Sequence, residues 1–101
     1  MRELPIACEL AANEIAARRE GLLPGLVAHA QERIDLPDGF RWRFVPGSEV
    51  LSAITQAIDL ERQCCKFLNF VLIVEPDAGP IWLEVTGPAG TAEFLKTLVT
   101  Q

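Results

Sequence analysis

The chain has 101 residues, of which half are hydrophobic and 23% are charged, and its formal net charge is −5. This length and composition predict one domain, residues 1–101, with its own apolar core rather than a disordered chain. The acidic balance argues against nucleic acid or an anionic membrane as a partner, because both bind basic surfaces. No apolar run reaches the roughly 18 residues of a membrane span, and the first residues lack the apolar core of a signal peptide, so we expect a cytoplasmic protein.

The first half of the chain predicts a strand, a broken helix and a second strand. Residues 5–10 alternate between larger apolar side chains and small or polar ones, which is the period of a half-buried strand. Helical composition runs from about residue 11 to residue 33, and Pro24-Gly25 predicts a break into two shorter helices. After a turn, residues 40–45 predict a strand with three aromatic side chains on one face and two arginines on the other, solvated face.

The second half predicts a long helix, a β-hairpin and a final helix. The helix extends from Ser48, its expected N-cap, to about residue 67. Residues 69–75 are apolar on both faces, which predicts a central strand, and a short loop leads to the return strand at 81–86. Thr91 caps the last helix. The order β-α-β-α-β-β-α, with helices on one face of a small mixed or antiparallel sheet, predicts an α+β two-layer sandwich.

The chemically distinctive residues are three cysteines, Cys8, Cys64 and Cys65, together with Glu61. On a helical wheel, Glu61 falls in the middle of the apolar stripe one turn before Cys65, and Cys64 falls on the shoulder of that stripe. A carboxylate directed at a core is costly unless it is paired, hydrogen-bonded, protonated or bound to a metal. Because the cysteine count is odd and no export signal is visible, thiols are expected rather than disulfides.

These four residues predict a metal site. Three sulfurs and a carboxylate form a four-ligand set suited to a soft or borderline ion, such as zinc or a thiophilic heavy metal. Adjacent cysteines on a helix diverge by about 100°, so Cys64 and Cys65 could share one ion only in the wedge between them or where the helix ends. A real site would also bring the Cys8 sulfur within several ångströms of this pair and direct Glu61 into the same cavity.

The first alternative is a structural or interaction domain. A buried cysteine is often only a small hydrophobic residue, so all three cysteines could belong to the core. The chain could then be a homodimer that uses Trp42, Trp82 and its apolar strands as an interface. Glu61 would pair with an arginine at the edge of the core. The candidate arginines are Arg18, Arg19 and Arg43.

The second alternative is a thiol redox protein or an enzyme with a reactive thiolate. Such a cysteine needs a base or a cationic neighbour that lowers its pKa. Arg62 and Lys66 are close in the sequence, but the only histidine, His29, lies in the first helical segment. We therefore rank this alternative below metal binding and expect that the protein is not an enzyme.

Two stretches carry a resemblance to a known family. They read ERQCCKFLNF at residues 61–70 and IWLEVTGPAG at residues 81–90. Together with the N-terminal half, they resemble a family of short bacterial proteins of unassigned function, with the patterns E-R-x-C-C-x-F-x-x-F and W-L-x-x-T-G-P-x-G. The resemblance covers nearly the whole chain and implies a loose association with heavy-metal resistance genes, but no reaction or ligand.

The resemblance also implies that Cys8, Cys64, Cys65 and Glu61 are the residues of interest. The family commonly has proline directly after the cysteine pair, where this chain has Lys66. Because proline disfavours helical backbone at the residue before it, its absence leaves the end of the helix less firmly fixed.

Overall fold

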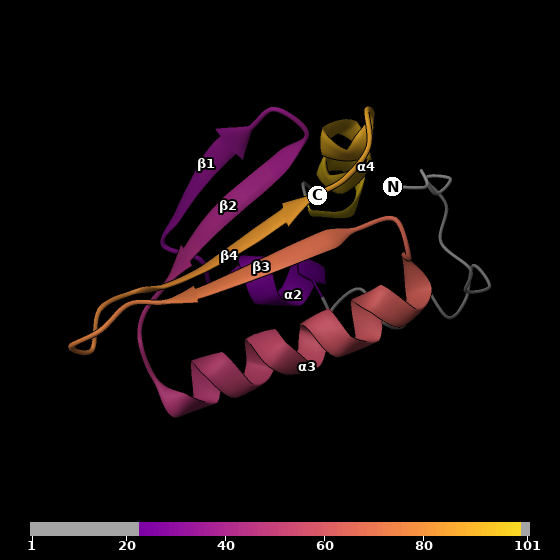
Figure 1. Ribbon diagram of the computed structural model, residues 1–101. Helices are drawn as coiled ribbons and strands as arrows, with labels where there is room; N and C mark the ends of the chain where they lie inside the picture. The colour runs from indigo at the N-terminus through magenta and orange to yellow at the C-terminus, as the bar shows by residue number, and fades with distance from the viewer. Residues whose placement is uncertain (1–22, 100–101) are drawn as a thin grey trace.

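A computed structural model describes residues 23–99 (Figure 1). Its elements are α2 (Leu23–Val27), β1 (Glu32–Leu36), β2 (Gly39–Phe44), α3 (Ser48–Cys64), β3 (Asn69–Val74), β4 (Ile81–Thr86) and α4 (Thr91–Val99). The described part therefore has an α+β fold, with three helices and an antiparallel sheet of four strands. The strand predicted at residues 5–10 and the first part of the helix predicted after it lie outside the described residues.

The sheet has the strand order β1-β2-β4-β3, and every neighbouring pair is antiparallel. β3 and β4 form the hairpin that the sequence predicted. β1 and β2 form a second hairpin. β2 joins it to the first, because β2 pairs along its whole length with β4, from Gly39 opposite Thr86 to Phe44 opposite Ile81. Within the described sheet, β2 and β4 are thus the central strands, and β1 and β3 are the edges.

Strand β1 corrects the predicted end of the first helical stretch. The helix was expected to continue to about Arg33, but Glu32–Leu36 is a strand paired with β2. Leu36 lies directly opposite Gly39, so only Pro37 and Asp38 form the connecting turn. A two-residue turn fixes an antiparallel partner for the preceding residues, and this tertiary pairing overrides their helical composition.

Strand β3, predicted as a central strand, lies at an edge of the described sheet. Because the strand predicted at residues 5–10 lies outside the described residues, the central position of β3 stays a prediction. Apolar residues on both faces of a strand indicate that both faces can be buried, but they do not identify the strands on either side. Val71 and Ile73 lie opposite Glu84 and Trp82, on the face of the sheet away from the core. Their exposed fractions are 39% and 37%.

The core lies between the other face of the sheet and the helices. The core-facing side chains of the central strands are each at most 3% exposed. They are Phe40, Trp42 and Phe44 from β2 and Ile81, Leu83 and Val85 from β4. Each helix contributes to the same cluster, with Leu23 from α2, Ile54 from α3 and Leu95 from α4. Trp42 belongs to this core, so the prediction that it supplies a dimer interface is wrong.

Helix α3 differs at both ends from the predicted helix. Its N-cap is Gly47, at φ 156° and ψ 150°, and Ser48 is the first helical residue, so the prediction of Ser48 as N-cap is wrong. This backbone conformation is essentially restricted to glycine, which explains why glycine precedes the helix. The helix ends at Cys64 and not near residue 67. None of the helices within residues 23–99 has both the length and the apolarity to cross a bilayer.

Candidate functional site at the end of α3

Glu61 and Cys65 lie on the core side of α3, where the apolar stripe placed them. Glu61 is 4% exposed and Cys65 is 2% exposed, and Ile54 and Ala57 are buried on the same side of the helix. Glu61 and Thr91 are the polar or charged residues that the described part of the chain buries to this degree. The sequence therefore identified correctly the position where a carboxylate enters an apolar environment.

The two adjacent cysteines straddle the end of the helix. Cys64 is the last helical residue, and Cys65 is the C-cap, with φ −117° and ψ 83°. The Cys65 backbone N–H donates to the Glu61 carbonyl at 2.6 Å, and the Leu68 N–H donates to the Cys65 carbonyl at 3.2 Å. This tight turn leads directly into β3 (Figure 1). Because Cys65 is not a helical residue, the 100° spacing of neighbouring helical residues does not apply to this pair.

The Glu61 carboxylate connects α3 to the beginning of α2. Its Oε2 accepts a hydrogen bond of 3.1 Å from the backbone N–H of Leu23, which is itself 1% exposed. The first N–H groups of a helix lack partners within the helix, so a buried acceptor satisfies one of them. This bond gives one physical reason why a carboxylate is tolerated in the core.

The arginine partners predicted for Glu61 divide into two groups. Arg43 lies on the opposite face of the sheet, where Nη1 is 3.9 Å from Oε1 of Glu32 and the guanidinium lies 5.9 Å from the centre of the Trp82 ring. Arg43 is therefore not the partner of Glu61. Arg18 and Arg19 lie outside the described residues.

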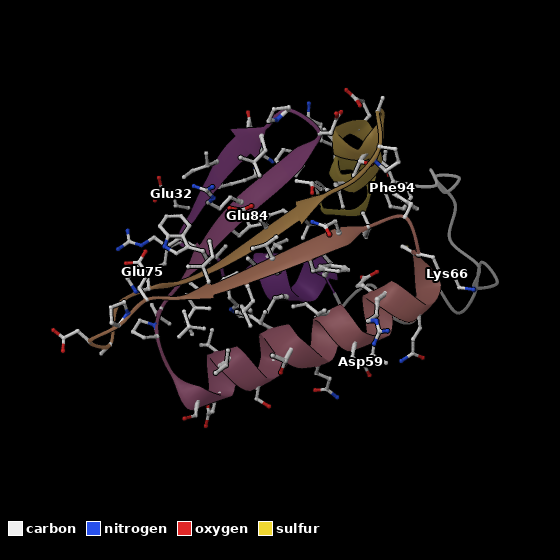
Figure 2. All side chains as sticks on the ribbon, viewed as in Figure 1. Glu32, Asp59, Lys66, Glu75, Glu84 and Phe94 are labelled. Carbon is white, nitrogen blue, oxygen red and sulfur yellow. The ribbon has the colours of Figure 1, made fainter. Side chains whose placement is uncertain are left out.

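Apolar side chains surround the inner side of the cysteine turn, and charged side chains lie on its outer side. Cys65 belongs to the same core cluster as Phe67, whose ring packs edge-to-face on Phe94 of α4 with centroids 5.1 Å apart. Asp59 and Lys66 are both exposed, and Lys66 lies just beyond the end of α3 (Figure 2). Cys65 is thus buried as a member of the core cluster.

The structure describes the side chains of only two of the four predicted ligands, Glu61 and Cys65. Cys8 lies outside the described residues, and the backbone of Cys64, but not its side chain, is described. Among the side chains that are described, no three or more of His, Cys, Asp or Glu gather in a way that could hold a metal ion. The convergence of Cys8 with the cysteine pair therefore stays a prediction.

No family model, curated protein or solved structure matches this chain. Any functional assignment consequently depends on the chemistry of Glu61 and the cysteine turn.

Two contacts were not predicted from the sequence. The first is the bond from Leu23 to Glu61, which depends on how α2 packs against α3. The second is an ion pair on the outer face of the sheet, where Nε and Nη2 of Arg41 lie 2.8 Å and 2.6 Å from Oε2 of Glu84. These two residues are direct cross-strand partners in β2 and β4. Opposite charges predict an ion pair only between residues that are known to face each other across two strands, and the sequence alone did not give this register.

Proposed function

We propose that the protein binds a soft or borderline metal ion, such as zinc or a thiophilic heavy-metal ion, through cysteine thiolates. Cys64 and Cys65 are the central ligands, and Cys8 and Glu61 complete the set. The observation that supports this proposal best is the position of the cysteine pair across the end of α3, one turn after a buried carboxylate. Thiolates select zinc, copper(I) and heavier thiophilic ions over hard cations.

The hydrogen bond to Glu61 is compatible with a role as ligand. Carboxylates that bind metals are usually hydrogen-bonded as well, and these bonds orient the oxygen that faces the ion. Oε2 of Glu61 accepts a hydrogen bond from the Leu23 N–H. Glu61 would therefore contribute a single oxygen from a carboxylate that α2 already orients.

The proposal extends to the whole chain as a cytoplasmic two-layer domain of residues 1–101 that binds metal and is not an enzyme. Its acidic charge, −5, favours a cation over nucleic acid as a ligand. The resemblance to a family loosely associated with heavy-metal resistance genes agrees with this chemistry.

A structural or interaction domain is the second candidate, and the burial of Cys65 favours it. A thiol that is 2% exposed among aromatic and aliphatic side chains packs as a small hydrophobic residue. In this case, substitution of either cysteine changes stability and nothing else. A thiol redox protein ranks third, because a reactive thiol needs a base or a cationic neighbour, and the one histidine in the sequence, His29, follows α2.

The test of the metal proposal is a titration of the reduced apo-protein with Zn(II), Hg(II) and As(III), followed by thiolate-to-metal absorption in the ultraviolet. We expect saturation at one ion per chain for at least one of these metals. The Cys64→Ser/Cys65→Ser double variant should lose this absorption, and Cys8→Ser should weaken binding.

The contribution of Glu61 is measured against a matched carboxylate on the same helix. Glu61→Gln should weaken binding by about 10-fold or more, as expected when a group that ligates or orients a metal is changed. Asp59→Asn removes an exposed charge from the same helix and should have little effect. If wild type and the double cysteine variant give the same titration curves, the metal proposal is wrong.

A further inference from the structure

The two edges of the described sheet differ sharply in charge. β1 has three charged residues among its five, Glu32, Arg33 and Asp35. β3, with the sequence NFVLIV, has none. Exposed edge strands normally carry charges, proline or a bulge, because a flat apolar edge is a template for another strand. β1 thus has the composition of a solvent-exposed edge, whereas β3 has that of a strand with a neighbour on each side.

The packing at the β3 edge is also incomplete on the core side of the sheet. In β2 and β4, the residues that face the helices are at most 3% exposed. The equivalent residues of β3 are Phe70 and Leu72, which are half-buried, and Val74, which is 55% exposed. A further strand beside β3 would supply the side chains that cover this end of the core.

The beginning of α2 lies near the end of α3 that leads into β3. The N–H of Leu23 is bonded to Glu61, and the chain folds back from Glu61 through Cys65 before β3 starts at Asn69. Residues 11–22 would span about 18 Å as a helix. Residues 5–10 would then be within reach of β3, and they have the same length as this strand and the alternating pattern of a half-buried one.

We propose that residues 5–10 add to the sheet as a fifth strand, paired with the edge of β3 that no other described strand occupies, with Ile6, Cys8 and Leu10 facing the helices. Covalent connection gives this segment a high effective concentration at the edge. A second copy of the chain would compete less well, because each copy carries a charge of −5 and the two repel each other.

This pairing deepens the proposed function, on which its consequence for metal binding rests. Neighbouring strands lie about 4.8 Å apart, so a fifth strand would place Cys8 beside β3 on the side of the sheet that carries α3. The cysteine turn leads into β3 from the same side. Strand addition would therefore bring Cys8 to the edge next to Cys64 and Cys65.

Nuclear magnetic resonance of the full-length, reduced, metal-free protein tests the pairing directly. We expect cross-strand nuclear Overhauser effects between residues 5–10 and β3. Alternate amides of β3 point away from β4, and their hydrogen exchange should be slowed by at least about 10-fold relative to open-edge amides. Leu10→Asp should abolish this protection, whereas the matched variant Glu9→Lys, on the other face of the segment, should retain it.

Three results would overturn the inference. They are fast exchange of these β3 amides with no cross-strand effects in wild type, equal protection in the two variants, and contacts between β3 strands of different chains in a mixture of labelled and unlabelled protein. The last result would assign the edge to a second copy. Because the protein is metal-free in this experiment, the pairing can fail while metal binding stands, and the reverse also holds.

Discussion

Replacing Glu61 with alanine is expected to lower the free energy of unfolding by about 3 kcal/mol. The substitution leaves the buried Leu23 N–H without its acceptor, which costs about 1–3 kcal/mol. It also opens a cavity between α2 and α3 that adds to this loss. For a domain of this size, the melting temperature should fall by on the order of 10–20 °C. Urea denaturation followed by far-ultraviolet circular dichroism measures the change.

Two further variants separate the role of the buried acceptor from a general effect on α3. Glu61→Gln retains the volume and a carbonyl oxygen for the Leu23 N–H, so it should lose less than half as much as Glu61→Ala. Asp59→Ala removes an exposed carboxylate that lies 3.6 Å from Arg62, and its effect should stay within about 0.5 kcal/mol. Equal losses for Glu61→Ala and Asp59→Ala would contradict the role of Glu61 as a buried acceptor.

Saturation with a thiophilic metal should stabilise wild type more than any substitution considered above destabilises it. At a free ion concentration about 1,000-fold above Kd, binding to the native state contributes about 4 kcal/mol. This corresponds to a rise in melting temperature on the order of 20 °C. Thermal melts of the reduced protein with and without Zn(II) measure the shift.

The specificity of this stabilisation has its own controls. Mg(II), a hard cation that prefers oxygen ligands, should leave the melting temperature of wild type unchanged. The Cys64→Ser/Cys65→Ser variant should show no rise with Zn(II). A similar rise in this variant would mean that the ion binds elsewhere on the acidic surface.

Much of the fold could be predicted because local patterns decided it. The apolar run, loop and return strand of the β3–β4 hairpin, the apolar stripe of α3 and the presence of α4 all agree with the structure, although Thr91 is the first helical residue of α4. The prediction failed at β1, where the residues allowed a helix and a two-residue turn selected a strand. The alternation of Ile34 and Leu36 before the Pro37-Asp38 turn was the signal for that hairpin.

The candidate site was harder to predict than the fold. A helical wheel places Glu61 and Cys65 on the core side of α3, and both are buried there. It does not reveal that α3 ends between Cys64 and Cys65, because the non-helical backbone of Cys65 and the turn closed by the bond from the Leu68 N–H to the Cys65 carbonyl mark that end. The hydrogen bond from the Leu23 N–H to Glu61 could not be predicted from the sequence either, because tertiary packing brings the two groups together.

X-ray absorption at the zinc edge of the complex with one equivalent of Zn(II) tests the central claim most directly, because it reports the atoms bound to the ion. Coordination by Cys64 and Cys65, completed by Cys8 and Glu61, predicts two or three sulfur atoms at about 2.3 Å and an oxygen at about 2.0–2.2 Å. Loss of the sulfur shell in the Cys64→Ser/Cys65→Ser variant would assign it to this pair. A wild-type spectrum with only nitrogen or oxygen neighbours near 2.0–2.1 Å would contradict thiolate binding.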